Sequence, residues 1–111
     1  MVNTKNDQYY IDKIKKDLKF VIDHTAGKSK DEIEKDELLI DSIMFRIIQI
    51  SENNGKLTEQ FKNNHPEVPW LAIKGMRNRI VHEYGYVDFT FVYDTINHGI
   101  PEMLERLESI Q

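Results

Sequence analysis

The sequence predicts an all-α domain, an up-down bundle of four or five helices. Apolar residues recur at steps of three and four along most of the chain, which is typical of helices with one buried face. No stretch of useful length alternates apolar and polar residues as a β-strand would. The chain has 111 residues, enough for one core and short for two, so we predict a single domain over residues 1–111.

The first predicted helix has an apolar stripe on one face and lysines and aspartates on the other. It ends in the stretch 24–30, where Gly27 suits a C-terminal cap. Ser29 followed by Glu32 forms a capping-box pattern, so we expect a second helix to begin there. The apolar stripe of this helix is wide, which is typical of a helix that faces more than one partner, and Gly55 either ends the helix or weakens it. The stripe residues of the two helices are Tyr10, Ile14, Leu18, Val21, Leu39, Ile43, Ile47 and Ile50.

Prolines and a glycine bound the third predicted helix. Residues 63–70 form a predicted loop, because each proline disfavours helix in the residue before it. Pro69 suits the first turn of a helix over about residues 70–84, and Gly85 is a natural stop. We therefore expect one continuous helix between this loop and Gly85.

The last quarter of the chain predicts a fourth helix and a terminal one. Asp88 is placed to cap the fourth helix at its N-terminus. Gly99 and Pro101 then predict a break or kink before the last helix, which carries apolar residues as far as Ile110.

Composition narrows the classes of function. The chain lacks cysteine, which excludes disulfides, thiolate zinc sites and cysteine nucleophiles. It has no signal-peptide-like start and no run near the roughly 18 apolar residues of a membrane span, so we expect a soluble, cytoplasmic protein without a membrane segment. The formal net charge is −4, so bulk electrostatics repels nucleic acid and any RNA chemistry must depend on a local cationic patch.

The segment RNRIVHEYGY at residues 77–86 gathers more reactive groups than any other part of the chain. Arg77 offers a planar fork of donors that matches a phosphate, and His82 is the side chain best suited to moving protons near neutral pH. Asn78 lies one turn before His82, so its amide can hold the imidazole in one tautomer. Arg77 and His82 are five residues apart, about 140° around an ideal helix. Either the helix loosens at its end or a second copy of the chain completes the site, and this geometry favours a dimer.

Together these groups are the minimum for metal-independent cleavage of RNA. His82 would assist attack by a ribose 2′-hydroxyl on the adjacent phosphorus or protonate the leaving oxygen, and Arg77 would stabilise charge on the phosphoryl oxygens. Lys74 and Arg79 add positive charge within about a turn. No metal-ligand spacing and no glycine-rich phosphate loop occurs in the sequence, so we expect no metal or other cofactor. The competing interpretation is structural, because arginine and histidine near a helix C-terminus also interact favourably with the helix dipole.

Residues 66–107 resemble the HepT-like branch of the HEPN family. That branch has Pro-x-x-Pro-Trp, then Arg-Asn, then His-x-Tyr, then Val-Asp before the penultimate helix. The preceding QISEN at 49–53 falls where the family usually has Gly-Glu, with Glu52 as the acid and Ser51 in place of the glycine. The N-terminal third matches only in its helical periodicity. The residues that carry the resemblance are Pro66, Pro69, Trp70, Arg77, Asn78, His82, Tyr84, Val87 and Asp88.

The resemblance implies a homodimer in which the Arg-x4-His-x-Tyr residues of both protomers line a cleft. Active members of this branch are metal-independent ribonucleases that act as toxins. Their antitoxin, of the MntA type, is a minimal nucleotidyltransferase that silences the toxin by transferring AMP from ATP to the motif tyrosine, here Tyr84. Arg79 occupies a position where the family tolerates apolar residues, and we expect it only to aid RNA docking. Glu52 either orients a motif residue or is a buried structural acid.

Two other functions compete with the ribonuclease toxin. One is a non-catalytic HEPN subunit that partners a nucleotidyltransferase and binds nucleotide without cleaving RNA. The other is an inert helical dimer scaffold. The intact Arg77, His82 and Tyr84 favour the enzyme, while the acidic composition favours the binding subunit.

Overall fold

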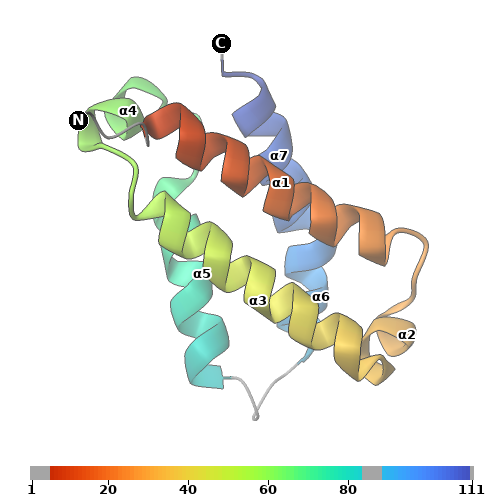
Figure 1. The fold of residues 1–111 in the computed structure, drawn as a ribbon. Coiled ribbons are helices and arrows are strands. Elements are labelled where there is room, and N and C mark those ends of the chain that lie inside the picture. Colours follow the sequence, from red (N-terminus) through yellow and green to blue (C-terminus); the bar gives the residue numbers. More distant parts are fainter. Residues whose placement is uncertain (1–5, 84–88, 111) are drawn as a thin grey trace.

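The computed structural model describes residues 6–83 and 89–110, with the backbone alone for residues 79–83. Within these ranges the chain is helical and contains no β-strand, which confirms the predicted all-α class (Figure 1). The elements in chain order are α1 (Asp7–Thr25), α2 (Lys30–Lys35), α3 (Glu37–Asn54), α4 (Glu59–Asn64), α5 (Trp70–Glu83), α6 (Phe89–Asp94), the π-helical turn η1 (Thr95–Gly99) and α7 (Ile100–Glu108). Because α6, η1 and α7 run on without a break, the described chain forms four long helical rods and two short helices, α2 and α4.

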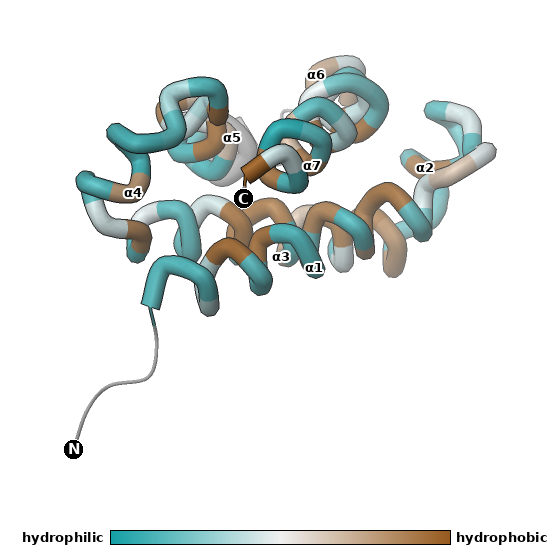
Figure 2. The backbone as a smooth tube through the Cα atoms, turned by 90° about the horizontal axis from the view of Figure 1, so that it is seen from above, coloured by the Kyte–Doolittle hydropathy of each residue, from teal (hydrophilic) through white to brown (hydrophobic). Residues whose placement is uncertain are grey.

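The four rods pack in two layers (Figure 2). α1 and α3 lie side by side and antiparallel in one layer, while α5 and the rod of α6, η1 and α7 cross them in the other. α3 packs against α1 and α5, and α7 packs against α1, so the position of α5 depends chiefly on α3. Fully buried aliphatic side chains make the core, among them Ile14, Leu18, Val21, Ile43, Ile47, Ile50, Ile73, Ile96, Ile100 and Leu107.

Hydrogen bonds at the first helix ends follow the sequence signals. The Asn6 side chain accepts the Tyr9 N–H at 3.0 Å and caps α1. Gly27 has a φ of 74° in the turn after α1, the left-handed conformation that favours glycine. The Glu32 N–H donates to Ser29 Oγ at 3.1 Å and the Ser29 N–H to Glu32 Oε1 at 2.8 Å, so the predicted capping box is confirmed. Hydrogen bonding from the Ser29 backbone, and then from its hydroxyl, lowers the pKa of the Glu32 carboxyl.

The predicted second helix is two helices, because Asp36 interrupts it. Asp36 has an extended backbone, and its side chain accepts the Leu39 N–H at 3.0 Å to cap α3. Aspartate forms such local bonds readily, and apolar periodicity does not reveal them. Gly55 caps α3 and ends it. The chain then turns into α4, whose N-cap Thr58 also donates to the Asp7 carboxylate from its N–H at 2.9 Å and its hydroxyl at 2.7 Å.

The break or kink predicted at Gly99 and Pro101 is instead a π-helical turn inside a continuous rod. Pro101 has no N–H, and its ring crowds the carbonyl of the preceding turn. The turn before it therefore widens, and the Ile100 N–H donates to Thr95 O, five residues back. The proline locates the irregularity but does not end the helix.

The start of the third predicted helix is confirmed. α5 begins at Trp70 and remains α-helical as far as Glu83. The predicted end of this helix near Tyr84, its stop at Gly85 and the N-cap at Asp88 lie outside the described residues. None of the described helices is long and apolar enough to cross a membrane.

Candidate functional site

Arg77 on α5 forms an ion pair with Glu52 on α3. Arg77 Nε lies 3.2 Å from Glu52 Oε1, and the two side chains are 42% and 53% exposed. Glu52 is therefore not a buried acid, which excludes one of the two roles considered for it. The Nε–H does not point along a hydrogen bond to the carboxylate, so the attraction is that of two close opposite charges. Among the described residues no other ion pair or hydrogen bond engages the guanidinium.

Side chains of α3 hold the backbone of α5 just before Arg77. The Ser51 hydroxyl donates to Lys74 O at 3.3 Å, and Asn54 Nδ2 donates to Trp70 O, also at 3.3 Å. Both Ser51 and Asn54 are buried. The sequence analysis did not predict these two contacts. Ser51 and Asn54 lie four and seven residues after Ile47, on the buried face of α3. A polar residue at a buried position indicates a hydrogen bond of this kind.

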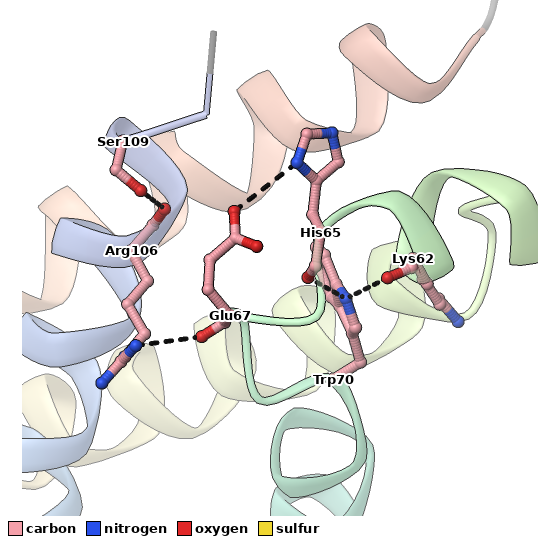
Figure 3. A network of polar contacts seen from close by, with 6 residues as sticks. All are labelled: Lys62, His65, Glu67, Trp70, Arg106 and Ser109. Carbon is pink, nitrogen blue, oxygen red and sulfur yellow. Dashed lines mark hydrogen bonds and ion pairs between the residues drawn. The ribbon is translucent and has the colours of Figure 1, made fainter.

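The loop that leads into α5 is also held in place. Figure 3 shows Trp70 Nε1 between two backbone carbonyls, of Lys62 at 3.1 Å and His65 at 3.0 Å. On the other side of the loop, Arg106 of α7 donates to Glu67 O at 3.1 Å (Figure 3). The start of α5 is thus fixed from α3, α4 and α7.

The remaining candidate residues follow Arg77 along α5. Lys74, one turn before it, and Asn78, next to it, are both exposed. The side chains of Arg79 and His82 lie outside the described part, as does all of Tyr84. The backbone is α-helical from Arg77 through His82, so the helix does not loosen there and the angle of about 140° between the two residues stands.

Exposed apolar side chains lie in line with the candidate residues on both helices. On α3, Leu38 is 79% and Phe45 58% exposed, and Glu52 follows at the same seven-residue spacing. On α5, Leu71 is 83% exposed and lies seven residues before Asn78. Residues seven apart share a helix face, so each of these faces carries both apolar and candidate polar residues.

Gly75 lies within α5 next to the same face. A Cβ built at Gly75 would meet no heavy atom within 4 Å beyond its chain neighbours and its own helix backbone. Glycine inside a helix costs up to about 1 kcal/mol relative to alanine, and no crowding in the described structure requires it. The ranges that the structure describes also contain no group of three or more histidine, aspartate or glutamate side chains that could hold a metal ion.

Comparison with known proteins identifies the family. A family model described as Ribonuclease HepT-like matches residues 14–110. The chain belongs to the HepT-like ribonuclease family. This confirms the resemblance drawn from the motif residues, and the HepT-like match includes every candidate residue from Glu52 to Tyr84.

Several relatives with ribonuclease names align with the chain, two of them over nearly its whole length. A protein of Caldanaerobacter subterraneus subsp. tengcongensis named "Putative RNase" is 30% identical over 106 residues, covering 96% of this chain and 95% of that protein. A protein of Methanocaldococcus jannaschii, also named "Putative RNase", is 26% identical over 106 residues, covering 96% and 88%. A Thermococcus cleftensis protein named "Probable ribonuclease HepT" is 31% identical over 62 residues, 56% of each chain. No solved structure matches the chain significantly.

Proposed function

We propose that this HepT-like protein is an endoribonuclease that cleaves RNA without a metal ion, with Arg77 and His82 as its central residues. The observation that carries the proposal is the ion pair at 3.2 Å between Arg77 and Glu52. Glu52 contacts Nε of the guanidinium, so the carboxylate lies on the stem side of the arginine, whose side chain is 42% exposed. A guanidinium presented in this way matches two oxygens of a phosphodiester.

The proposed reaction is a transfer of the phosphoryl group within the RNA strand. The ribose 2′-hydroxyl attacks the adjacent phosphorus, the bond from phosphorus to the 5′ oxygen of the next nucleotide breaks, and a 2′,3′-cyclic phosphate results. His82 takes the proton of the 2′-hydroxyl or gives a proton to the leaving 5′ oxygen. Arg77 stabilises the negative charge that builds on the two non-bridging oxygens, and Asn78 orients the imidazole.

The proposed site is completed by a second copy of the chain. On one straight α5, positions 77 and 82 lie about 140° apart around the helix axis, which is too far for both residues to reach one phosphate easily. A partner protomer can supply the missing residue across a two-fold cleft. The exposed Phe45 and Leu71 support this arrangement, because they would become buried on the same helix faces that carry the polar residues. Gly75 would allow the partner to approach α5 closely.

We further propose that the protein is the toxin of a two-gene toxin–antitoxin pair and that Tyr84 is its regulatory position. A nucleotidyltransferase antitoxin of the MntA type would catalyse attack of the Tyr84 hydroxyl on the α-phosphorus of ATP, with pyrophosphate as the leaving group. The attached AMP adds a negative charge and bulk two residues from His82, where it would compete with RNA for Arg77.

The competing function is a HepT-like subunit that binds nucleotide or a partner without cleaving RNA, and the formal net charge of −4 favours it. The deciding experiment is RNA cleavage by the purified protein in excess chelator, with the Arg77→Ala and His82→Ala proteins beside it. The ribonuclease proposal expects cyclic phosphate ends from the wild type, and a loss of about 10²–10⁴-fold in each variant with the helical spectrum unchanged. Cleavage that survives in His82→Ala would contradict it.

A further inference from the structure

A pocket of about 350 Å³ lies between α4 and the start of α5, one helical turn from Arg77. Lys62 and Asn63 of α4 line one side, and Trp70, Leu71 and Lys74 of α5 line the other. A volume of this size is within the range of sites that hold small ligands, roughly 300–1,000 Å³. Arg77, Asn78 and His82, which we propose to carry out the reaction, are not among the residues that line this pocket.

The walls of the pocket are fixed before any ligand arrives. Trp70 donates its indole N–H to the backbone carbonyls of Lys62 and His65, which joins the two sides of the pocket. Asn54 of α3, itself only 1% exposed, lines the pocket and holds Trp70 O. The indole N–H of Trp70, a lining residue, is already bonded, so a ligand in the pocket would contact the ring and not the donor. A preformed wall lowers the entropy cost of binding.

The chemistry of the lining fits a nucleotide. The charged residues that line the pocket are two lysines, Lys62 and Lys74, and one acid, Glu59. The pocket is therefore locally cationic, although the chain has a net charge of −4. Asn63 is exposed and brings a carboxamide, the group that pairs with the edges of bases. An aromatic ring beside a cationic groove is the usual combination for holding single-stranded RNA, because every base can stack on the ring.

We propose that this pocket binds the RNA nucleotide next to the scissile phosphate, with its base against Trp70 and its phosphate at Lys62 and Lys74. The inference rests on the proposed ribonuclease function and adds the path of the substrate. Lys74 and Arg77 are three residues apart and neighbours on the surface of α5. They can therefore contact consecutive phosphates of one strand, which leads from the pocket to the proposed cleavage site.

The test uses a short 2′-O-methyl oligoribonucleotide, which lacks the 2′-hydroxyl nucleophile and so reports binding without cleavage. Trp70 is the only tryptophan of the chain, so its fluorescence reports on this pocket alone. We expect the oligonucleotide to quench or shift Trp70 emission with the same Kd that anisotropy of a labelled oligonucleotide gives. Binding seen by anisotropy without any change at Trp70, or no binding at all, would overturn the proposal.

Lys62→Ala supplies the matched variant, because it removes the ammonium group and keeps the backbone carbonyl that holds Trp70. We expect a Kd about 3- to 10-fold weaker, and a slope of log Kd against log salt that is smaller by roughly 0.7, the value for one lost phosphate contact on a single strand. Lys35→Ala is the control, since Lys35 is exposed on α2 at the opposite end of the molecule from α4 (Figure 1). If Lys62→Ala binds like the Lys35→Ala control with an unchanged slope, the proposed subsite does not exist.

Cleavage of unmodified RNA separates this inference from the function on which it rests. We expect Lys62→Ala to raise KM by the same 3- to 10-fold and to leave kcat unchanged, because Lys62 contacts no reacting atom. A protein that binds the 2′-O-methyl strand at Trp70 but cleaves no RNA would remove the ribonuclease proposal and keep the nucleotide site. If the wild type and Lys62→Ala both cleave RNA with the same KM, the ribonuclease proposal stands and the nucleotide site at Trp70 is removed.

Discussion

Glu52 and Arg77 stand on different helices, α3 and α5, with 3.2 Å between a carboxylate oxygen and the guanidinium Nε. Both side chains are about half exposed, and exposed ion pairs contribute only about 0–1 kcal/mol to stability. The contact therefore matters more for the direction of the arginine than for the free energy of folding. Ser51, next to Glu52, holds the backbone of α5 one turn before Arg77. α3 thus positions both the backbone and the side chain.

Replacing Glu52 by Gln should reduce RNA cleavage without changing the fold. The amide keeps the shape of the side chain but loses the charge that holds Arg77, and misplacement of a reacting group by about 1 Å costs up to 10²-fold in rate. We expect kcat to fall roughly 10-fold or more while Tm changes little. Glu102→Gln is the control, because it weakens a similar exposed pair, Arg106 Nη2 to Glu102 at 3.2 Å, on α7. Equal rates for the two variants would show that Glu52 does not position Arg77.

Replacing Leu71 by Glu should weaken the proposed dimer. Leu71 is 83% exposed in the single chain, so a charge there costs the monomer little, but it would be buried without a partner at the contact between copies. We expect sedimentation to show a Kd for dimerisation at least about 10-fold weaker, and sedimentation is the readout because Leu71 also lines the proposed RNA pocket. Ala72→Glu is the control, since Ala72 is also exposed but lies about 100° further around α5. Two variants that associate equally well would place the interface elsewhere.

Replacing Gly75 by Ala should separate the stability of the helix from the stability of the dimer. The new methyl group meets nothing in the single chain, so the folded monomer should gain about 0.5–1 kcal/mol from the better helix former. If the partner approaches α5 at this position, the same methyl group should weaken the dimer. Unfolding and sedimentation over a range of protein concentrations measure the two effects. A variant that is more stable and equally dimeric would remove Gly75 from the interface.

Replacing Tyr84 by Phe should abolish AMP transfer without loss of RNA cleavage. The variant keeps the ring and loses only the hydroxyl that would accept the nucleotide. Incubated with the nucleotidyltransferase and ATP, it should fold normally, stay active and show no mass increase of one AMP, while the wild type gains that mass and loses activity. An adduct on the Phe variant, at Tyr86 or elsewhere, would show that Tyr84 is the wrong tyrosine.

Pro69 predicts the start of α5 and Gly27 the termination of α1, while helical periodicity predicts the all-α class, because each of these signals is local in the sequence. Helical periodicity misses the interruption at Asp36, where a side-chain bond to Leu39 N–H competes with the helix. Gly99 and Pro101 predict a break or kink where the structure has a π-helical turn, since a helix can widen by one residue and remain continuous.

The sequence also predicts the candidate residues better than it predicts their contacts. Motif residues such as Arg77 can be recognised from type and spacing, but the partner of Arg77 depends on how α3 meets α5. Sequence reasoning left Glu52 with two roles, and only the tertiary contact excludes the buried one. The spacing of Ser51 and Asn54 from Ile47 indicates that both are buried and hydrogen-bonded, but their partners on the backbone of α5 depend on the tertiary contact between the helices.

The central claim, a site shared between two copies, is tested most directly by mixing two inactive proteins. Arg77→Ala and His82→Ala should each be inactive alone. If Arg77 of one protomer acts with His82 of its partner, a mixed dimer retains one intact site, whereas a site within one chain is never restored. After dissociation and reassociation of an equimolar mixture, half of the dimers are mixed and each has one of two sites, so we expect about a quarter of wild-type cleavage. A mixture that forms mixed dimers and stays inactive, beside an active wild type, would contradict the shared site.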